Sequence, residues 1–131
     1  MTFQEEFFEK FTFTKDQIDK YFATAKKSLE IAENASVPDV TFNFSYNALI
    51  KIGIAEIASK GFRIRSHEGH HMKIIQSLSE ILKDENINAF GNLMRRQRNL
   101  DLYNGGIFIA EKQSKEYLQF VKEIFKKATL Q

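Results

Sequence analysis

The chain has no cysteine and no tryptophan, a single proline at position 38 and only six glycines. Without cysteine it can form neither a disulfide framework nor a thiolate metal site, a composition that suits a reducing cytoplasm. No apolar run approaches the roughly 20 residues that a membrane-spanning helix needs. The N-terminal stretch MTFQEEFFEKF is acidic and aromatic, unlike a secretory signal. We therefore expect a cytoplasmic protein with no membrane segment.

The basic residues are distributed unevenly, although the net charge of +2 is too small to indicate nucleic-acid binding by itself. Every arginine lies between Arg63 and Arg98, and the three histidines fall in the same window, whereas the ends of the chain use lysine. The planar guanidinium fork of arginine can bind two phosphate oxygens at once. This window is therefore where we expect contacts with phosphate.

Length and composition predict one globular domain, residues 1–131, built from helices. Thr14 and Gln17 have the spacing of a capping box, which predicts a helix from there to about residue 34. After a loop, ASVPDVTFN, further helices are expected at about 45–60 with Gly61 as C-cap, 67–83, 86–103 and, beyond Gly105-Gly106, 110–128. The N-terminal phenylalanines should form a packing segment that covers the bundle or a second subunit. Short connections between long amphipathic helices predict an all-α fold, an antiparallel bundle of four to five helices.

The helices at 67–83 and 86–103 are expected to form an antiparallel hairpin with its turn near Asp84-Glu85. His71 and Arg98 then lie at one level, each about 18 Å from the turn at about 1.5 Å per residue. Helical phase predicts an inward polar layer of His67, His70, His71, Gln97, Arg98 and Asp101. On the helix at 86–103 it also places Leu93 and Met94 on the inward face, and it predicts an outward stripe of Arg95, Arg96, Asn99 and Tyr103. Arg63 and Arg65, in the loop that leads into the helix at 67–83, should lie at the same end of the bundle.

Residues 67–71 also match H-E-x-x-H, in which two histidines on one helix face bind zinc and the glutamate activates water. Here the pattern would open its helix with Gly69 inside it, and only Asp101 is placed to act as a third ligand. We therefore predict no metal site. A hydrogen-bonded histidine layer that closes the bundle accounts for at least two of the three histidines, and a zinc hydrolase is kept as a third alternative.

The segment GFRIRSHEGHHMKIIQSL, followed by MRRQRNLDLYNGG, resembles the HEPN superfamily, small prokaryotic helical bundles often encoded beside minimal nucleotidyltransferases. The resemblance covers most of the chain and rests on Gly61, His70-His71, Arg98-Asn99, Tyr103 and the amphipathic last helix. It implies an RNA- or nucleotide-binding domain. Many members are metal-independent endoribonucleases of toxin–antitoxin type that act as homodimers, which implies a homodimer without a cofactor.

In the family motif, arginine and a polar residue are followed four to six residues later by histidine. The arginine stabilises phosphate charge, and the histidine transfers protons during attack by the 2′-hydroxyl. Arg98-Asn99 matches the first half, but Tyr103, a poor general base at neutral pH, stands where the histidine is expected. The implied catalytic residues are Arg98, His71, His70 and Tyr103. The implied phosphate-binding residues are Arg95, Arg96, Asn99, Arg63 and Arg65.

The sequence leaves open whether the chain is an enzyme. The alternative to a ribonuclease is a catalytically silent binding or regulatory partner of a nucleotidyltransferase. Some relatives carry Arg-x4-His-x-Tyr, in which such a partner adenylylates the tyrosine. Counted from Arg96, this register puts Asp101 in place of the histidine and Tyr103 at the acceptor position. Without such a role, Tyr103 is expected to be an aromatic residue of the dimer interface.

Overall fold

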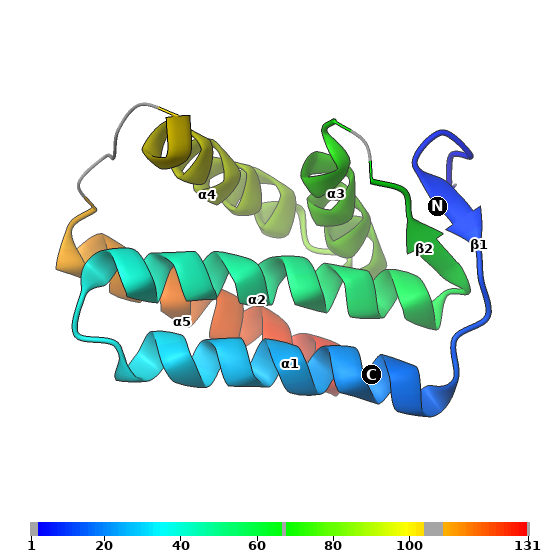
Figure 1. The fold of residues 1–131 in the computed structure, drawn as a ribbon, viewed down its shortest axis with the longest axis horizontal. Coiled ribbons are helices and arrows are strands. Elements are labelled where there is room, and N and C mark those ends of the chain that lie inside the picture. Colours follow the sequence, from blue (N-terminus) through cyan, green and yellow to red (C-terminus); the bar gives the residue numbers. More distant parts are fainter. Residues whose placement is uncertain (1–2, 67, 104–108, 131) are drawn as a thin grey trace.

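The computed structural model describes residues 3–66, 68–103 and 109–130, and most of them are helical. Within this described part the chain forms five helices and one small sheet (Figure 1). In chain order the elements are β1 (Phe8–Lys10), α1 (Lys15–Asn34), α2 (Pro38–Ser59), β2 (Phe62–Ile64), α3 (His70–Leu82), α4 (Glu85–Tyr103) and α5 (Glu111–Thr129). The expected all-α bundle of four to five helices is confirmed. None of the described helices combines the length and the apolar character that crossing a membrane requires.

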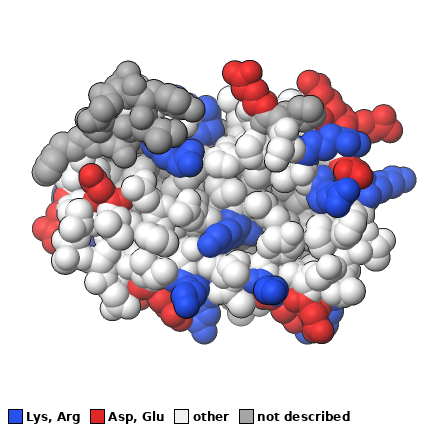
Figure 2. All heavy atoms as spheres, viewed as in Figure 1, with Lys and Arg blue, Asp and Glu red and all other residues white. Residues whose placement is uncertain are grey.

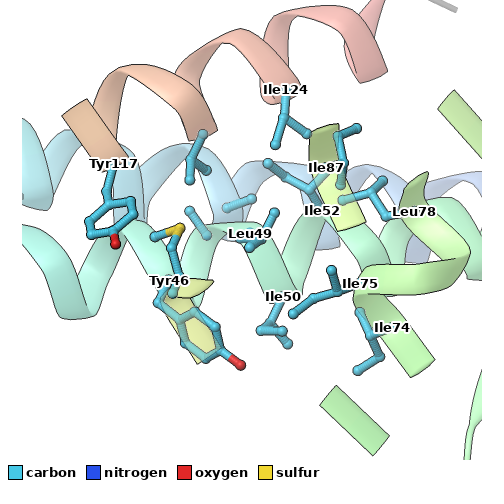
Figure 3. Packing of buried hydrophobic residues seen from close by; sticks show 14 of the residues in the cluster. Tyr46, Leu49, Ile50, Ile52, Ile74, Ile75, Leu78, Ile87, Tyr117 and Ile124 are labelled. Carbon is cyan, nitrogen blue, oxygen red and sulfur yellow. The ribbon is translucent and has the colours of Figure 1, made fainter. Parts of the chain in front are cut away.

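Helix α2 is the centre of the bundle. Helix α1 runs antiparallel beside it, α5 lies behind this pair, and α3 and α4 pack over the remaining side (Figure 1). Because α2 is in contact with neighbours on all sides, its apolar residues continue around the helix instead of forming one stripe. The largest fully buried apolar side chains belong to α2 and to the helices that pack on it: Tyr46, Leu49, Ile52, Ile57, Ile74, Ile75, Leu78, Ile87, Met94 and Val121. Figure 3 shows how several residues of this core pack.

Helix α1 begins and ends where the sequence predicts. The Thr14 hydroxyl oxygen accepts a hydrogen bond from the backbone N–H of Gln17 at 3.1 Å. The side-chain oxygen of Gln17 accepts in return from the backbone N–H of Thr14 at 2.8 Å. This reciprocal pair satisfies two amides that the helix itself leaves without partners, which is why the helix begins at this point.

Helix α2 begins at Pro38, well before the predicted start at about residue 45, so the prediction of a loop over ASVPDVTFN was wrong. Proline is favourable in the first helical turn, because its φ is already suitable and no partner is needed there for the missing N–H. Thr41 and Phe42, read as loop residues, are buried in the core. The other end matches the prediction: Gly61 follows the helix at φ +86°, a left-handed conformation that glycine adopts without strain.

The N-terminal aromatic segment forms a strand that the sequence analysis did not predict. Strand β1 pairs antiparallel with β2, so that Phe8 lies opposite Ile64 and Lys10 opposite Phe62. Phe3 stacks on Phe62 with ring centroids 4.1 Å apart. The expectation that this segment covers the bundle is therefore confirmed, and the hydrogen bonds to β2 are the means by which it is held.

Helix α3 begins at His70 and not at residue 67 as predicted, because Gly69 has a left-handed backbone with φ +80° and caps the helix. The turn to α4 lies at Lys83 and Asp84, close to the predicted turn. Glycine allows close packing of α3 against α2, since a Cβ at Gly53 would overlap the side chain of Ile74. This close approach brings the first turn of α3 next to α2, one helical turn before Ile74.

Candidate functional site

A cleft of about 370 Å³ opens between the start of α3 and the second half of α4. Its lining residues are Glu68, Gly69, His70, His71, Met72, Arg95, Arg98 and Asn99. On the face shown in Figure 2, basic and acidic side chains are intermixed and form no continuous basic patch. The cleft brings arginine, histidine and amide side chains together.

His71 forms a hydrogen bond with a buried tyrosine of α2. The Tyr46 hydroxyl lies 3.0 Å from Nδ1 of His71, and Tyr46 is fully buried at the edge of the core cluster (Figure 3). The guanidinium carbon of Arg98 lies 5.4 Å from the centroid of the Tyr46 ring, a cation–π geometry. One buried side chain thus contacts both His71 on α3 and Arg98 on α4.

The electrostatic environment keeps both partners of this hydrogen bond neutral at pH 7. Burial lowers the pKa of His71 from 6.5 to about 4, with further lowering by His70, Arg98 and Arg95. Burial also raises the pKa of Tyr46 to about 12, against the opposing effect of Arg98 and Arg95. The cleft therefore contains a neutral imidazole beside two permanently charged guanidinium groups.

The predicted pairing of His71 with Arg98 at one level of the hairpin is confirmed, since both line the cleft and both contact Tyr46. His70 also lines it, with its ring centroid 4.6 Å from that of His71. These three residues, drawn from two helices, are brought together as the sequence predicts.

The helical phase predicted for α4 was wrong at three positions. Arg95 and Asn99 were expected to point outward, but both line the cleft with Arg98, at the i, i+3 and i+4 positions of one helix face. The prediction placed Leu93 on the inward face, whereas Leu93 is 46% exposed and Met94 is fully buried. The inward face is therefore rotated toward Met94. Arg96 is exposed, as predicted, and does not line the cleft.

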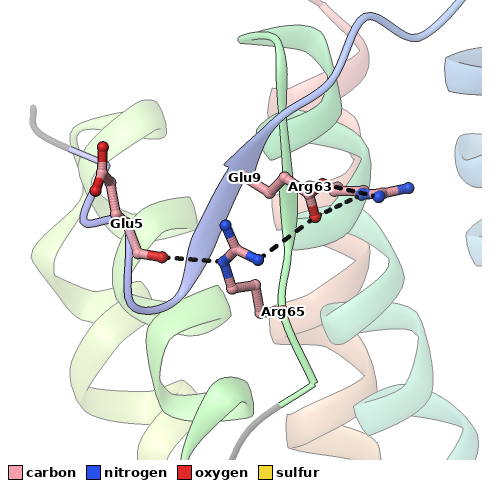
Figure 4. A network of polar contacts seen from close by, with 4 residues as sticks. All are labelled: Glu5, Glu9, Arg63 and Arg65. Carbon is pink, nitrogen blue, oxygen red and sulfur yellow. Dashed lines mark hydrogen bonds and ion pairs between the residues drawn. The ribbon is translucent and has the colours of Figure 1, made fainter.

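Arg63 and Arg65 belong to a different cluster, on the strand pair (Figure 4). The Arg63 guanidinium donates two hydrogen bonds to Glu9, at 3.0 and 3.1 Å. Arg65 donates to the backbone carbonyl of Glu5 at 3.0 Å and also forms an ion pair with Glu9 at 3.7 Å. Neither lines the cleft, so these arginines hold the N-terminal strand in place.

Gln97 points inward as predicted but does not join the histidines. Its side-chain oxygen accepts a hydrogen bond from the Tyr117 hydroxyl of α5 at 3.3 Å. His67 and the side chains of Asp101 and Tyr103 lie outside the residues that the structure describes. The predicted polar layer is thus divided between the cleft and this contact with α5.

The structure lacks the continuous helix that the zinc interpretation requires. H-E-x-x-H requires a continuous helix through its glutamate, but α3 begins only at His70, and Gly69 is left-handed. Among the residues that the structure describes, no three histidine, aspartate or glutamate side chains come close enough to hold a metal ion.

Tyr46 is the site residue that the sequence analysis missed. A tyrosine in a helix that is apolar on all sides is expected to be buried, and a buried phenol hydroxyl needs a hydrogen-bond partner. The sequence shows that such a partner must exist, but only the packing of α3 on α2 identifies it as His71.

No family model, curated protein or solved structure matches this chain.

Proposed function

We propose that the cleft binds a phosphate group of RNA or of a nucleotide, and that the chain is a HEPN-like binding domain. The observation that carries this proposal is the convergence of Arg95, Arg98 and Asn99 on the start of α3. Two guanidinium groups supply charged, planar pairs of donors that match phosphate oxygens. The Asn99 amide supplies a further donor beside them.

The N-terminus of α3 adds to the preference for an anion. Helix amides at this end carry partial positive charge, and the capping residue, Gly69, has no side chain to accept from them. Glu68 is the one carboxylate among the described residues that line the cleft. The two arginines outweigh its charge, so the cleft favours a negatively charged ligand.

Two versions of this function differ in what His71 does. In a metal-independent endoribonuclease, Arg98 would stabilise the phosphate charge and His71 or His70 would move protons. A general base is most effective when its pKa lies near the working pH, and the pKa of His71 is lowered to about 4, which counts against His71 as the base. In the second version the chain is a catalytically silent module that binds RNA or nucleotide beside a nucleotidyltransferase.

The resemblance to HEPN proteins also supports a cytoplasmic homodimer with a nucleotidyltransferase partner. Sedimentation at two protein concentrations tests the dimer. Copurification with the product of a neighbouring nucleotidyltransferase gene tests the partner, and mass spectrometry of Tyr103 in that complex tests adenylylation.

The deciding experiment measures binding and cleavage of a short single-stranded RNA at constant salt, in excess chelator. Arg98→Ala should weaken binding about tenfold or more, as expected for a lost charged hydrogen bond. Arg63→Ala is the matched control, because it removes an arginine that is paired with Glu9 outside the cleft. Equal losses in the two variants would assign the binding to general charge and reject the cleft.

Cleavage in the same reactions separates the two versions. A ribonuclease should lose its activity in both Arg98→Ala and His71→Ala while the chelator has no effect. A binding module should leave the RNA intact. Thermal unfolding of each variant shows whether a loss reflects the cleft or the fold, since Arg98 and His71 both contact the buried Tyr46.

A further inference from the structure

The hydroxyl of Tyr46 is a buried polar group with one partner. Tyr46 has no exposed surface, and Nδ1 of His71 is the one hydrogen-bond partner of its hydroxyl among the described residues. A buried phenol hydroxyl must donate its hydrogen to an acceptor, because an unpaired buried donor costs the full desolvation free energy of the O–H group. The geometry around this single bond therefore determines its direction.

Among the described residues, only one direction of this bond satisfies both groups. If the Tyr46 hydroxyl donates to Nδ1, its hydrogen has an acceptor, and the neutral imidazole carries its own hydrogen on Nε2. If Nδ1–H donates instead, the hydroxyl hydrogen has no acceptor among the described side chains. The cation of Arg98 over the ring strengthens the first arrangement, because it makes the phenol a better donor.

We infer that Tyr46 is a positioning residue, which holds His71 with a hydrogen on Nε2 so that this nitrogen donates a hydrogen bond to a phosphate in the cleft. Nδ1 is turned to the buried hydroxyl, and His71 also lines the cleft, so Nε2 is the nitrogen left for a ligand. The phosphate part of this inference rests on the proposed function. The assignment of the hydrogen to Nε2 does not.

The arrangement has a chemical consequence for the ligand. An Nε2–H group, like the guanidinium groups of Arg95 and Arg98, can only donate, so all three address the oxygen atoms of an anion. Tyr46 contacts both His71 and Arg98, and so it sets the distance between donors on α3 and α4. The cleft is thus organised as a set of donors around one phosphate, with a neutral histidine among them.

The test is nitrogen NMR of the imidazole rings at pH 7, which is practical because the chain has three histidines. In the wild type, the spectrum should show His71 with an unprotonated Nδ1 and a protonated Nε2. In Tyr46→Phe, which keeps the ring, the two neutral forms should mix. Tyr117→Phe is the matched control, because it removes another buried hydroxyl, one that bonds to Gln97 outside the cleft.

Inorganic phosphate is then titrated into the same samples. Phosphate should shift Nε2–H of His71 in the wild type and in Tyr117→Phe, and Tyr46→Phe should bind it about two- to tenfold more weakly, as expected for one hydrogen bond. A hydrogen found on Nδ1 in the wild type would overturn the inference, whether or not Tyr46→Phe folds. Phosphate that shifts no His71 signal would reject the phosphate site but leave the assignment by Tyr46 intact.

Discussion

Acid should destabilise this protein through His71. The pKa of its ring is lowered from 6.5 to about 4, because the ring is half-buried against Tyr46 and faces His70, Arg95 and Arg98. Between these two values the unfolded chain binds a proton on this residue while the folded chain does not. Stability from this group is therefore complete above pH 6.5 and is lost as the pH falls toward 4.

The size of the effect follows from the two pKa values. The difference between 6.5 and about 4, at about 1.4 kcal/mol for each pH unit, corresponds to an upper value of about 3.5 kcal/mol. Solvent reaches part of the His71 ring and screens its charge, so we expect about 2 kcal/mol. For a chain of this length, that corresponds to a fall of about 5 to 10 °C in Tm.

The assay is urea unfolding of the wild type and of His71→Gln at pH 7 and pH 4. Carboxylates that titrate over the same range contribute equally to both proteins and cancel in the difference. The variant loses the bond to Tyr46 at both pH values, so it should be less stable than the wild type at pH 7. At pH 4 the difference in unfolding free energy between the two proteins should be smaller by about 2 kcal/mol, because only the wild type loses the contribution of His71. A gap that is the same at both pH values would refute a lowered pKa for His71.

Three further changes test the packing, the caps and a buried acid. Gly53→Ala should destabilise by about 1–3 kcal/mol in urea unfolding, because its Cβ would overlap Ile74, and an unchanged midpoint would contradict this packing. Thr14→Ala should cost about 1 kcal/mol by loss of the capping box, and thermal unfolding that leaves Tm unchanged would reject it. Burial raises the pKa of Glu56, against the opposing charge of Lys60, so Glu56→Gln should stabilise at neutral pH and lose this advantage in acid; a constant advantage would contradict the assignment.

The features that the sequence predicts correctly depend on local chemistry. The capping box of Thr14 and Gln17 and the left-handed Gly61 each act within one or two turns, so their residue types are sufficient. The meeting of His71 and Arg98 also follows from local geometry, because two helices joined by a short turn must run back along each other.

The features that it misses have both distant and local causes. Strand β1 forms only because β2 lies beside it, and neither three-residue strand has an alternating pattern long enough to be identified alone. The start of α2 at Pro38 was read as a loop because proline usually interrupts structure, although in the first turn of a helix it does not. At α4, the prediction counted Leu93 as a core residue, but the position is largely exposed.

The position of the hydrogen on the His71 ring has different consequences for the two versions of the proposed function. A ribonuclease that uses this histidine as a base needs a lone pair on Nε2, which requires the ring hydrogen to move to Nδ1. That move would leave the buried Tyr46 hydroxyl without its acceptor, at a cost of about 1–3 kcal/mol. At 1.4 kcal/mol for each factor of ten, the competent form is reduced roughly 5- to 150-fold.

Tyr46→Phe should therefore act in opposite directions on the two functions. It removes the hydroxyl that holds the hydrogen on Nε2, so phosphate binding should weaken while any RNA cleavage by His71 should increase. Rates measured under single-turnover conditions at saturating protein separate the two effects, and Tyr117→Phe controls for the loss of a buried hydroxyl. If Tyr46→Phe abolished cleavage, the hydroxyl would be supporting a base, and the donor arrangement around the phosphate would have to be given up.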